Sequence, residues 1–347
     1  MAGLAGCHFT CLDSQRHAAT RSGTCRAGAV APSRNSQFVG RLGIKRGKSL
    51  KAIHVSSPSM ISSYVPKQWT KGGPANNERD NMTAVDYRGQ TTLITGASAG
   101  LGAEFARQLA ARGSNLVLVA RREDRLDKLA ETLSTEHGVM VTAIAADLSL
   151  PHAGQTLVEE TDRLGLRVTS LINNAGFGTY GVFHLEDADR LGDEITVNVA
   201  SVVSISRAYI ERLRQAGNGI LINVASNAAY QPNPLLAVYG ATRAFVLNFT
   251  EALWFESAGT GLKVLALSPG PTQTEFFDVI GTTNASGNTV LQTPRQVVEK
   301  ALHTLDRRNP PPSIISGRRN HLQALSVRLL TRRRAALTVG AMMKPAN

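Results

Sequence analysis

The sequence predicts an α/β fold: a doubly wound parallel sheet covered by helices on both faces, which gives three αβα layers in a single domain. From residue 91 onward, short apolar runs alternate with longer amphipathic segments, the pattern of repeated βαβ units. The runs are apolar almost throughout, as expected for strands buried on both faces. A glycine-rich turn joins the first run to the first helix. Ligands of such sheets bind beyond the carboxyl ends of the strands, so the candidate functional residues are those that follow them.

Six strands are expected along the chain. They lie at 92–95, 115–120, 139–145, 168–172, 219–224 and 262–267. Between the second and third strands, residues 122–137 form a polar helix whose Leu126, Leu129 and Leu133 share one stripe. The third strand leads to Asp147, so a carboxylate is expected at the binding edge of the sheet.

The composition is that of a globular protein, with 42% hydrophobic and 18% charged residues. The formal net charge of +12 comes from the two ends of the chain, because residues 78–306 carry 18 basic and 25 acidic residues. This mildly acidic centre argues against a nucleic-acid-binding domain. The three cysteines, Cys7, Cys11 and Cys25, all lie near the start at irregular spacing, so we expect no metal site. No apolar run approaches the roughly 20 residues that a membrane span requires.

Residues 1–85 are expected to be a disordered basic extension, because they show no hydrophobic period and almost no acid. Two interpretations stay open. The segment is an organelle transit peptide, which would direct the protein to a plastid or mitochondrion, or it lies upstream of a true start at Met82. In the second case we expect a cytoplasmic protein. No apolar region of a secretory signal follows the early charges.

The turn after the first strand is expected to hold a nucleotide. Gly96, Gly100 and Gly102 let the backbone turn tightly and approach a pyrophosphate, and the following helix then points its first N–H groups at the anion. The spacing, Thr-Gly-x-x-x-Gly-x-Gly, differs from the commonest dinucleotide fingerprint. Taken alone, such a pattern also fits a plain loop.

The end of the second strand favours NADP(H) over NAD(H). A fold that binds NAD normally places an acid there to accept a hydrogen bond from the ribose 2′-OH. Here Ala120 is followed by Arg121 and Arg122, whose planar guanidinium groups suit a 2′-phosphate. The alternative is that the two arginines simply begin a solvent-facing helix.

Several motifs in one order resemble the short-chain dehydrogenase/reductase family over residues 86–320. They are Thr95-Gly96-Ala97-Ser98-Ala99-Gly100-Leu101-Gly102, Asp147-Leu148, Asn173-Asn174-Ala175-Gly176, Asn198, Ser226, Tyr239 and Ser268-Pro269-Gly270. The resemblance implies a Rossmann-type fold and a nicotinamide cofactor. The implied cofactor-binding residues are Thr95, Gly96, Ser98, Gly100, Leu101, Gly102, Arg121, Arg122, Asp147, Leu148, Asn174, Ala175, Gly176, Tyr239, Arg243, Pro269, Gly270 and Thr272.

The resemblance also implies a catalytic set of Asn198, Ser226, Tyr239 and Arg243. Ser226 closes the fifth strand, and Tyr239 follows at the family's usual interval of 13 residues. Tyr239 would give a proton to the developing alkoxide, and Ser226 would donate a hydrogen bond to the carbonyl oxygen. Asn198 would hold a water that links the site to solvent. The expected reaction is NADPH-dependent reduction of a ketone or aldehyde, or the reverse oxidation of an alcohol.

Position 243 departs from the family, which has lysine there. Arg243 lies one helical turn after Tyr239, so both side chains face the same way. Arginine keeps its charge and donates hydrogen bonds, but it cannot readily release a proton. The alternative function is therefore a catalytically weak NADP-binding protein with a regulatory or scaffold role.

Substrate identity is expected to depend on two stretches, 177–185 and 272–291. Phe177, Tyr180, Phe183, Phe276 and Phe277 form either an apolar wall for a carbonyl/alcohol substrate or ordinary packing. Residues 281–288 are consistent with a flexible lid. By resemblance we also expect a homo-oligomer.

The C-terminal segment, 321–347, is expected to be a basic helix and tail. Leu322, Leu325, Leu329 and Leu330 alternate with arginines over residues 322–343. We favour a helix packed on the body or on a second subunit over peripheral contact with a membrane surface.

Overall fold

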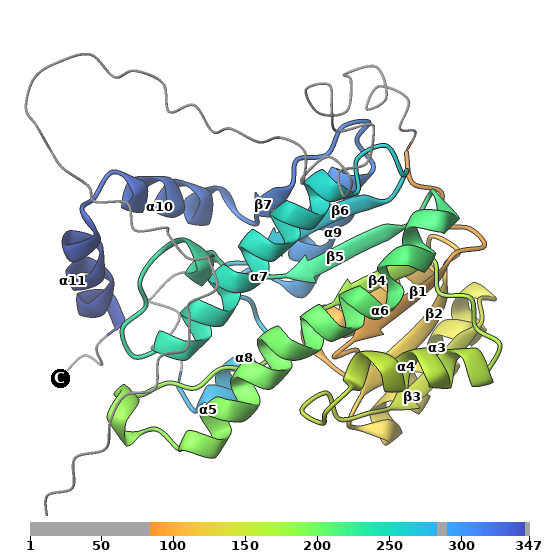
Figure 1. The fold of residues 1–347 in the computed structure, drawn as a ribbon, viewed down its shortest axis with the longest axis horizontal. Helices are drawn as coiled ribbons and strands as arrows, with labels where there is room; N and C mark the ends of the chain where they lie inside the picture. The colour runs from red at the N-terminus through yellow and green to blue at the C-terminus, as the bar shows by residue number, and fades with distance from the viewer. Residues whose placement is uncertain (1–83, 283–289, 344–347) are drawn as a thin grey trace, which may run out of the picture. The chain divides into compact units, whose positions relative to one another are not determined.

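The protein forms one parallel sheet between two layers of helices (Figure 1). The computed structural model describes residues 84–282 and 290–343, so the interpretations of residues 1–85 fall almost entirely outside the described residues. The strands are β1 (Thr91–Thr95), β2 (Asn115–Ala120), β3 (Val141–Ala145), β4 (Ser170–Asn173), β5 (Ile220–Val224), β6 (Lys263–Ser268) and β7 (Ser313–Ile315). Their order is β3-β2-β1-β4-β5-β6-β7, and every pairing is parallel. The predicted doubly wound fold is confirmed.

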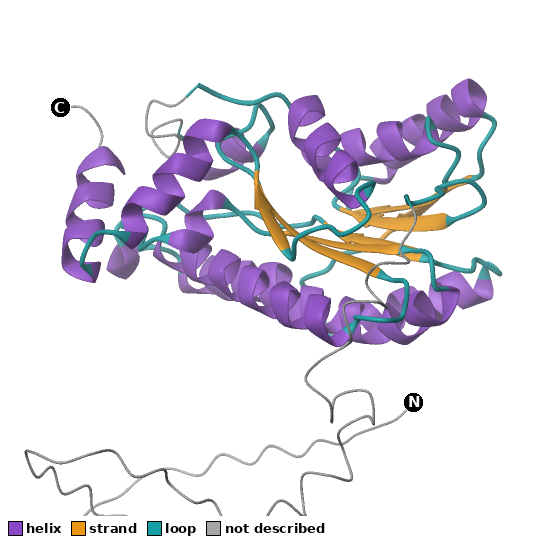
Figure 2. Ribbon diagram, turned by 90° about the horizontal axis from the view of Figure 1, so that it is seen from above, coloured by secondary structure: helices purple, strands orange, loops and turns teal. Residues whose placement is uncertain are grey.

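Helices cover both faces of the sheet, as Figure 2 shows from above. Helices between β1 and β4 are α2 (Gly100–Ala110), α3 (Glu123–His137) and α4 (Ala153–Arg163). Between β4 and β6 follow α5 (Ala188–Ile195), α6 (Ser201–Ala216) and α7 (Ala237–Glu256). The last part of the described chain holds α8 (Phe276–Ile280), α9 (Pro294–Leu305), α10 (Arg318–Arg328) and α11 (Arg332–Met343).

Successive side chains along each strand point to opposite faces of the sheet, so the hydrophobic core has one part on each face. In β1, Ile94 packs in the cluster that includes side chains of α2, α3 and α9, whereas Leu93 packs in the cluster that includes side chains of α4 and α6. Both side chains are fully buried, which explains why the strands are apolar at consecutive positions. The order of the strands reverses between β1 and β4, and a crevice for a ligand is expected at that point of the sheet.

Two elements near the C-terminus differ from the sequence prediction. Strand β7 was not among the six expected strands, because three half-buried residues at a sheet edge carry almost no periodic signal. The single helix expected over 322–343 was wrong, since the helix breaks after Arg328 into α10 and α11. The predicted boundary after residue 320 falls inside α10. The leucine stripe of α10 is exposed, with Leu322 at 65% and Leu325 at 45%, while Ala324 is buried.

Within residues 84–282 and 290–343, no helix has both the length and the apolar character needed to cross a bilayer. The same residues contain no group of three His, Cys, Asp or Glu side chains suited to a metal ion. The three cysteines lie outside the described residues.

Candidate active site

The turn between β1 and α2 forms a tight cradle. Gly96 has a φ of +66°, in the left-handed region that favours glycine. A Cβ on Gly102 would lie 2.3 Å from the carbonyl oxygen of Gly96, so this position has no room for a side chain. Asn174 supports the turn from β4, because its Nδ2 donates to the carbonyl oxygen of Thr95 at 2.9 Å. A bound phosphate could therefore approach the backbone at the start of α2.

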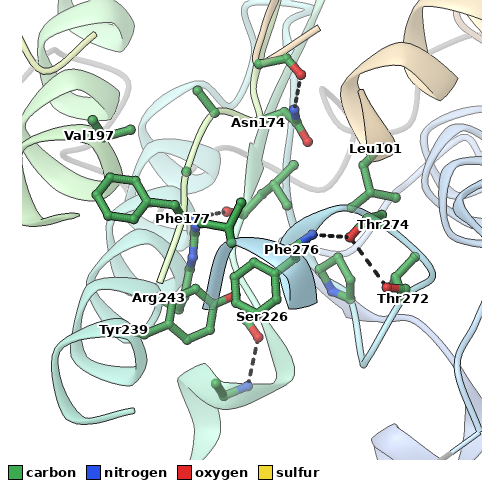
Figure 3. A pocket seen from close by; sticks show the side chains of 18 of the residues that line it. Leu101, Asn174, Phe177, Val197, Ser226, Tyr239, Arg243, Thr272, Thr274 and Phe276 are labelled. Atoms are coloured by element: carbon green, nitrogen blue, oxygen red, sulfur yellow. Dashed lines mark hydrogen bonds between the residues drawn. The ribbon is translucent and has the colours of Figure 1, made fainter. Parts of the chain in front are cut away.

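A cleft of about 680 Å³ extends from this cradle across the carboxyl edge of the sheet. Figure 3 shows part of its lining. Most of the predicted site residues line it: Gly96, Ser98, Gly100, Leu101, Arg121, Arg122, Asp147, Leu148, Asn174, Ala175, Gly176, Ser226, Tyr239, Arg243, Pro269, Gly270 and Thr272. Thr95, Gly102 and Asn198 do not line the cleft. Thr95 and Asn198 accept hydrogen bonds from the backbone N–H groups of Asn174 and Phe177, which do line it.

Arginine side chains gather at the β2 end of the cleft. Arg122 donates from Nε and Nη2 to Ser98 Oγ, at 3.2 and 3.0 Å. Asp147 follows β3, and hydrogen bonds from the backbone and side chain of Ser149, at 2.9 and 2.8 Å, hold the pKa of its carboxyl below the usual range. The glycine cradle and the arginines therefore fit a dinucleotide that carries a 2′-phosphate.

Ser226 and Tyr239 lie at the other end of the same cleft (Figure 3). The hydroxyl of Ser226 accepts a hydrogen bond from the backbone N–H of Ala228 at 3.1 Å and donates to Asn227 Oδ1 at 3.3 Å. Tyr239 lies in the first turn of α7, and its ring centroid is 5.2 Å from that of Phe276. A carbonyl in this end of the cleft can therefore meet two hydroxyl donors.

Arg243 lies beneath Tyr239 as a buried cation, with 4% of its surface exposed. Its guanidinium carbon is 5.1 Å from the centroid of the Tyr239 ring. Nη1 donates to the carbonyl oxygen of Val224 at 3.0 Å, and Nη2 donates to Asn198 Oδ1 at 3.3 Å. Nε is buried and has no hydrogen-bond partner among the described residues. The guanidinium is thus fixed by the protein itself through one N–H of each Nη atom, and its Nε–H stays without a partner among the described residues.

Asn198 holds this arrangement from a π-helical turn, Thr196–Ala200, between α5 and α6. Its Oδ1 also accepts from the backbone N–H of Phe177 at 3.1 Å, and its Nδ2 donates to the carbonyl oxygen of Phe177 at 2.8 Å. Nδ2 also contacts Thr242 Oγ1 at 3.1 Å. Asn198 therefore links the loop after β4 to α7, and the water predicted for it stays a prediction.

The predicted apolar wall is only partly assembled. Phe177, Phe276 and Phe277 line the cleft, whereas Tyr180 and Phe183 do not. The hydroxyl of Tyr180 instead donates to the carbonyl oxygen of Met343, and Phe183 is 63% exposed. Most of the lid predicted at 281–288 lies outside the described residues.

Sequence reasoning missed several groups in and around the cleft. Helix α11 contributes Val339, Met342 and Met343 to its lining, and Glu275 lies beside the arginines. The pattern of leucines and arginines in the C-terminal segment predicted a helix packed on the body or on a second subunit, but it did not single out these three positions. Glu194 was also missed. It is fully buried, accepts from Thr179 Oγ1 at 3.0 Å, and burial raises the pKa of its carboxyl.

A parallel sheet with a phosphate cradle at one end of a cleft and a Ser–Tyr pair at the other defines a nucleotide-dependent oxidoreductase. The chain belongs to the short chain dehydrogenase family, whose model matches residues 90–285. The predictions of this family and of an oxidoreductase are confirmed.

Curated and solved relatives agree with this membership. The chain is 31% identical over 242 residues to a 7beta-hydroxysteroid dehydrogenase of Collinsella aerofaciens, covering 69% of this chain and 90% of that protein. It is 38% identical over 188 residues to sulfoacetaldehyde reductase 2 of Chromohalobacter salexigens, covering 53% and 73%. A short-chain dehydrogenase from Sphingobium yanoikuyae in complex with NADPH superposes with a TM-score of 0.62 at 35% identity, covering 72% and 95%. That complex agrees with the NADP(H) prediction.

Proposed function

We propose that this oxidoreductase reduces a ketone or aldehyde with NADPH. The observation that carries the proposal is one continuous cleft that holds Ser98 and Arg122 at one end and Ser226 and Tyr239 at the other. The first pair matches a 2′-phosphate, and the second matches a carbonyl oxygen. When bound, the cofactor would supply a hydride to the carbonyl carbon.

The side chains at the catalytic end have three different roles: proton transfer, hydrogen bonding to the substrate oxygen, and the placing of a positive charge. Tyr239 gives its phenolic proton to the substrate oxygen, and Ser226 turns its hydroxyl from Asn227 to donate to the same oxygen. Arg243 places a fixed positive charge beneath this tyrosine, with its guanidinium carbon 5.1 Å from the centroid of the Tyr239 ring. Asn198 keeps that charge in position through Nη2.

The substrate we infer is a carbonyl compound with a sizeable apolar body. Phe276 and Phe277 pack edge to face at 5.7 Å, and α11 adds methionine side chains to the same cleft. Apolar and aromatic lining of this kind recognises ligands by burial of hydrophobic surface. The relative that acts on a hydroxysteroid supports this class more than the relative that reduces sulfoacetaldehyde. A homo-oligomer and a cytoplasmic or organellar location stay predictions.

Binding and turnover test the proposal with the full chain. NADPH should bind more tightly than NADH, and a panel of steroid ketones, 3-oxoacyl thioesters and small aldehydes, including sulfoacetaldehyde, should identify the substrate through NADPH oxidation. Tyr239→Phe should lower turnover by about 100-fold or more while NADPH binding is kept. Tyr230→Phe is the matched control, because Tyr230 does not line the cleft and its hydroxyl lies 3.4 Å from Ser268 Oγ.

A catalytically weak NADP-binding protein is the second candidate, and the buried Arg243 is the observation that favours it. Its Nη atoms are engaged with Val224 and Asn198, so they are less available to a cofactor ribose. Tight NADPH binding without turnover on the whole panel would support this candidate. A chain that binds neither NADPH nor NADH would contradict both.

A further inference from the structure

An ion pair crosses the arginine end of the cleft between segments that are far apart in the sequence. Glu275 Oε2 lies 2.8 Å from Arg122 Nη1, and Glu275 Oε1 lies 2.6 Å from Arg125 Nη1. Glu275 immediately precedes α8, whereas Arg122 and Arg125 lie at the start of α3. One carboxylate thus joins two arginines with both of its oxygens.

The same guanidinium is the one expected to recognise the cofactor. Arg122 contacts Ser98 through Nε and Nη2, so Nη1 is the nitrogen that Glu275 occupies. A carboxylate and a phosphate oxygen compete for the same N–H groups, because both are anionic acceptors that a guanidinium binds in the same way. Glu275 therefore fills the position in which a 2′-phosphate would be recognised.

The charge state of Glu275 makes this competition strong. Hydrogen bonds from Arg125 and Arg122 lower the pKa of the Glu275 carboxyl, so it is ionised at neutral pH. A 2′-phosphate beside it would place like charges in contact, which is unfavourable. The three side chains are each 42–45% exposed, so an incoming phosphate can reach them.

We propose that Glu275 is a built-in competitor for the 2′-phosphate of NADP(H), holding Arg122 and Arg125 until the phosphate displaces it. The proposal rests on the proposed NADP(H) site. Glu275 thereby lowers the affinity for NADP(H). It leaves the affinity for NAD(H), which lacks the 2′-phosphate, unchanged. It also ties α8 to α3 only while the phosphate is absent. This is a specificity-determining role, distinct from the chemistry at Tyr239.

Two nucleotides that differ only in the 2′-phosphate test the proposal by calorimetry. With the full chain at low ionic strength, Glu275→Gln should bind 2′,5′-ADP about tenfold more tightly than the unchanged protein does. Binding of 5′-AMP, which is 2′,5′-ADP without its 2′-phosphate, should change less than twofold. The gain should shrink in high salt, because these charges are half exposed and screened.

Glu160→Gln is the matched control. Glu160 also forms an arginine pair, with Arg163 at 2.6 Å, but it lies on α4 and does not line the cleft. The Glu160→Gln variant removes the same charge from the whole molecule. It should leave the affinity for both nucleotides unchanged.

The results of these binding measurements test the competitor role of Glu275 and the NADP(H) assignment separately. Weaker binding of 2′,5′-ADP to Glu275→Gln would mean that Glu275 positions the arginines for phosphate, and equal binding would mean that it does not compete; either result overturns the proposal while NADP(H) stands. An equal gain with 5′-AMP would also overturn it. If the unchanged protein prefers 5′-AMP, the NADP(H) assignment itself fails, and the competitor role of Glu275 fails with it.

Discussion

At the scale of single residues, we expect the side chain at position 243 to influence the transfer of the Tyr239 proton. Lysine has a compact ammonium group with three rotatable donors, whereas the guanidinium of Arg243 is fixed by Val224 and Asn198. We expect Arg243→Lys to raise turnover by about tenfold, because the smaller head can move between the protein and a bound ribose and can exchange a proton. Steady-state NADPH oxidation measures this.

The matched control for Arg243→Lys is Arg212→Lys. Arg212 is paired with Asp162, with N–O distances of 2.6 and 2.8 Å, and it does not line the cleft. It should not change turnover. If a folded Arg243→Lys variant has unchanged or lower turnover, arginine is the working residue at this position.

Glu194 should make the stability of the protein depend on pH. Burial raises the pKa of its carboxyl, although the nearby Arg243 acts in the opposite direction. The folded protein therefore holds this proton at pH values where the unfolded chain has lost it, so Glu194 costs stability as pH rises from the unfolded pKa towards the folded one. Glu194→Gln removes that cost. Its free energy of unfolding relative to the unchanged protein should rise with pH, by up to about 1.4 kcal/mol per unit of pKa shift.

Denaturant unfolding from pH 4 to 8 tests the Glu194 prediction, with Glu159→Gln as the control. Glu159 is exposed on α4 and accepts from Gln155 at 2.7 Å. A constant difference between Glu194→Gln and the unchanged protein across this range would show that the carboxyl does not change its charge there.

At the scale of elements, the junction of β1 with α2 depends on how closely two backbone segments approach. A Cβ at position 102 would meet the Gly96 carbonyl at 2.3 Å, and a backbone atom cannot rotate away as a side chain can. Gly102→Ala should therefore destabilise the fold by about 2 kcal/mol or more and weaken NADPH binding by opening the cradle.

Gly192→Ala provides the comparison for Gly102→Ala. Gly192 lies within α5, and a Cβ there would meet nothing within 4 Å. Alanine at this position should stabilise the helix by up to about 1 kcal/mol. Thermal unfolding measures the stability of both variants. If Gly102→Ala and Gly192→Ala change it equally, the backbone around Gly102 can move to make room for a Cβ.

Over the whole molecule, the sequence is informative where structure depends on neighbouring residues. Strand β2 was predicted with its observed bounds, because one apolar run and its flanking polar residues define it. The cradle and the Tyr239–Arg243 turn were predictable for the same reason, since their residues are a few positions apart. Strand β7 was missed because it is short and depends on pairing with β6.

The missed parts of the site depend on contacts between distant segments. Glu275 lies 153 positions from Arg122, and Met343 lies 163 positions from Tyr180. Neither pair forms a local pattern in the sequence. The resemblance to known dehydrogenases indicated where the cofactor binds, but it could not indicate that the last helix reaches the same cleft.

Because helix α11 lines the candidate active site, we expect it to influence which substrate the protein prefers. Figure 1 shows α8, α10 and α11 on one side of the sheet, and Met342 of α11 lines the cleft, whereas Leu337 of the same helix does not. Both side chains are exposed to a similar extent, 59% and 65%. Met342→Ala should raise KM for an apolar ketone about fivefold through lost burial of hydrophobic surface, with kcat and NADPH affinity nearly unchanged. Leu337→Ala should leave all three as they are. If both variants give the same KM, α11 does not contact the substrate, and the apolar body inferred for the substrate must be recognised by the phenylalanines alone.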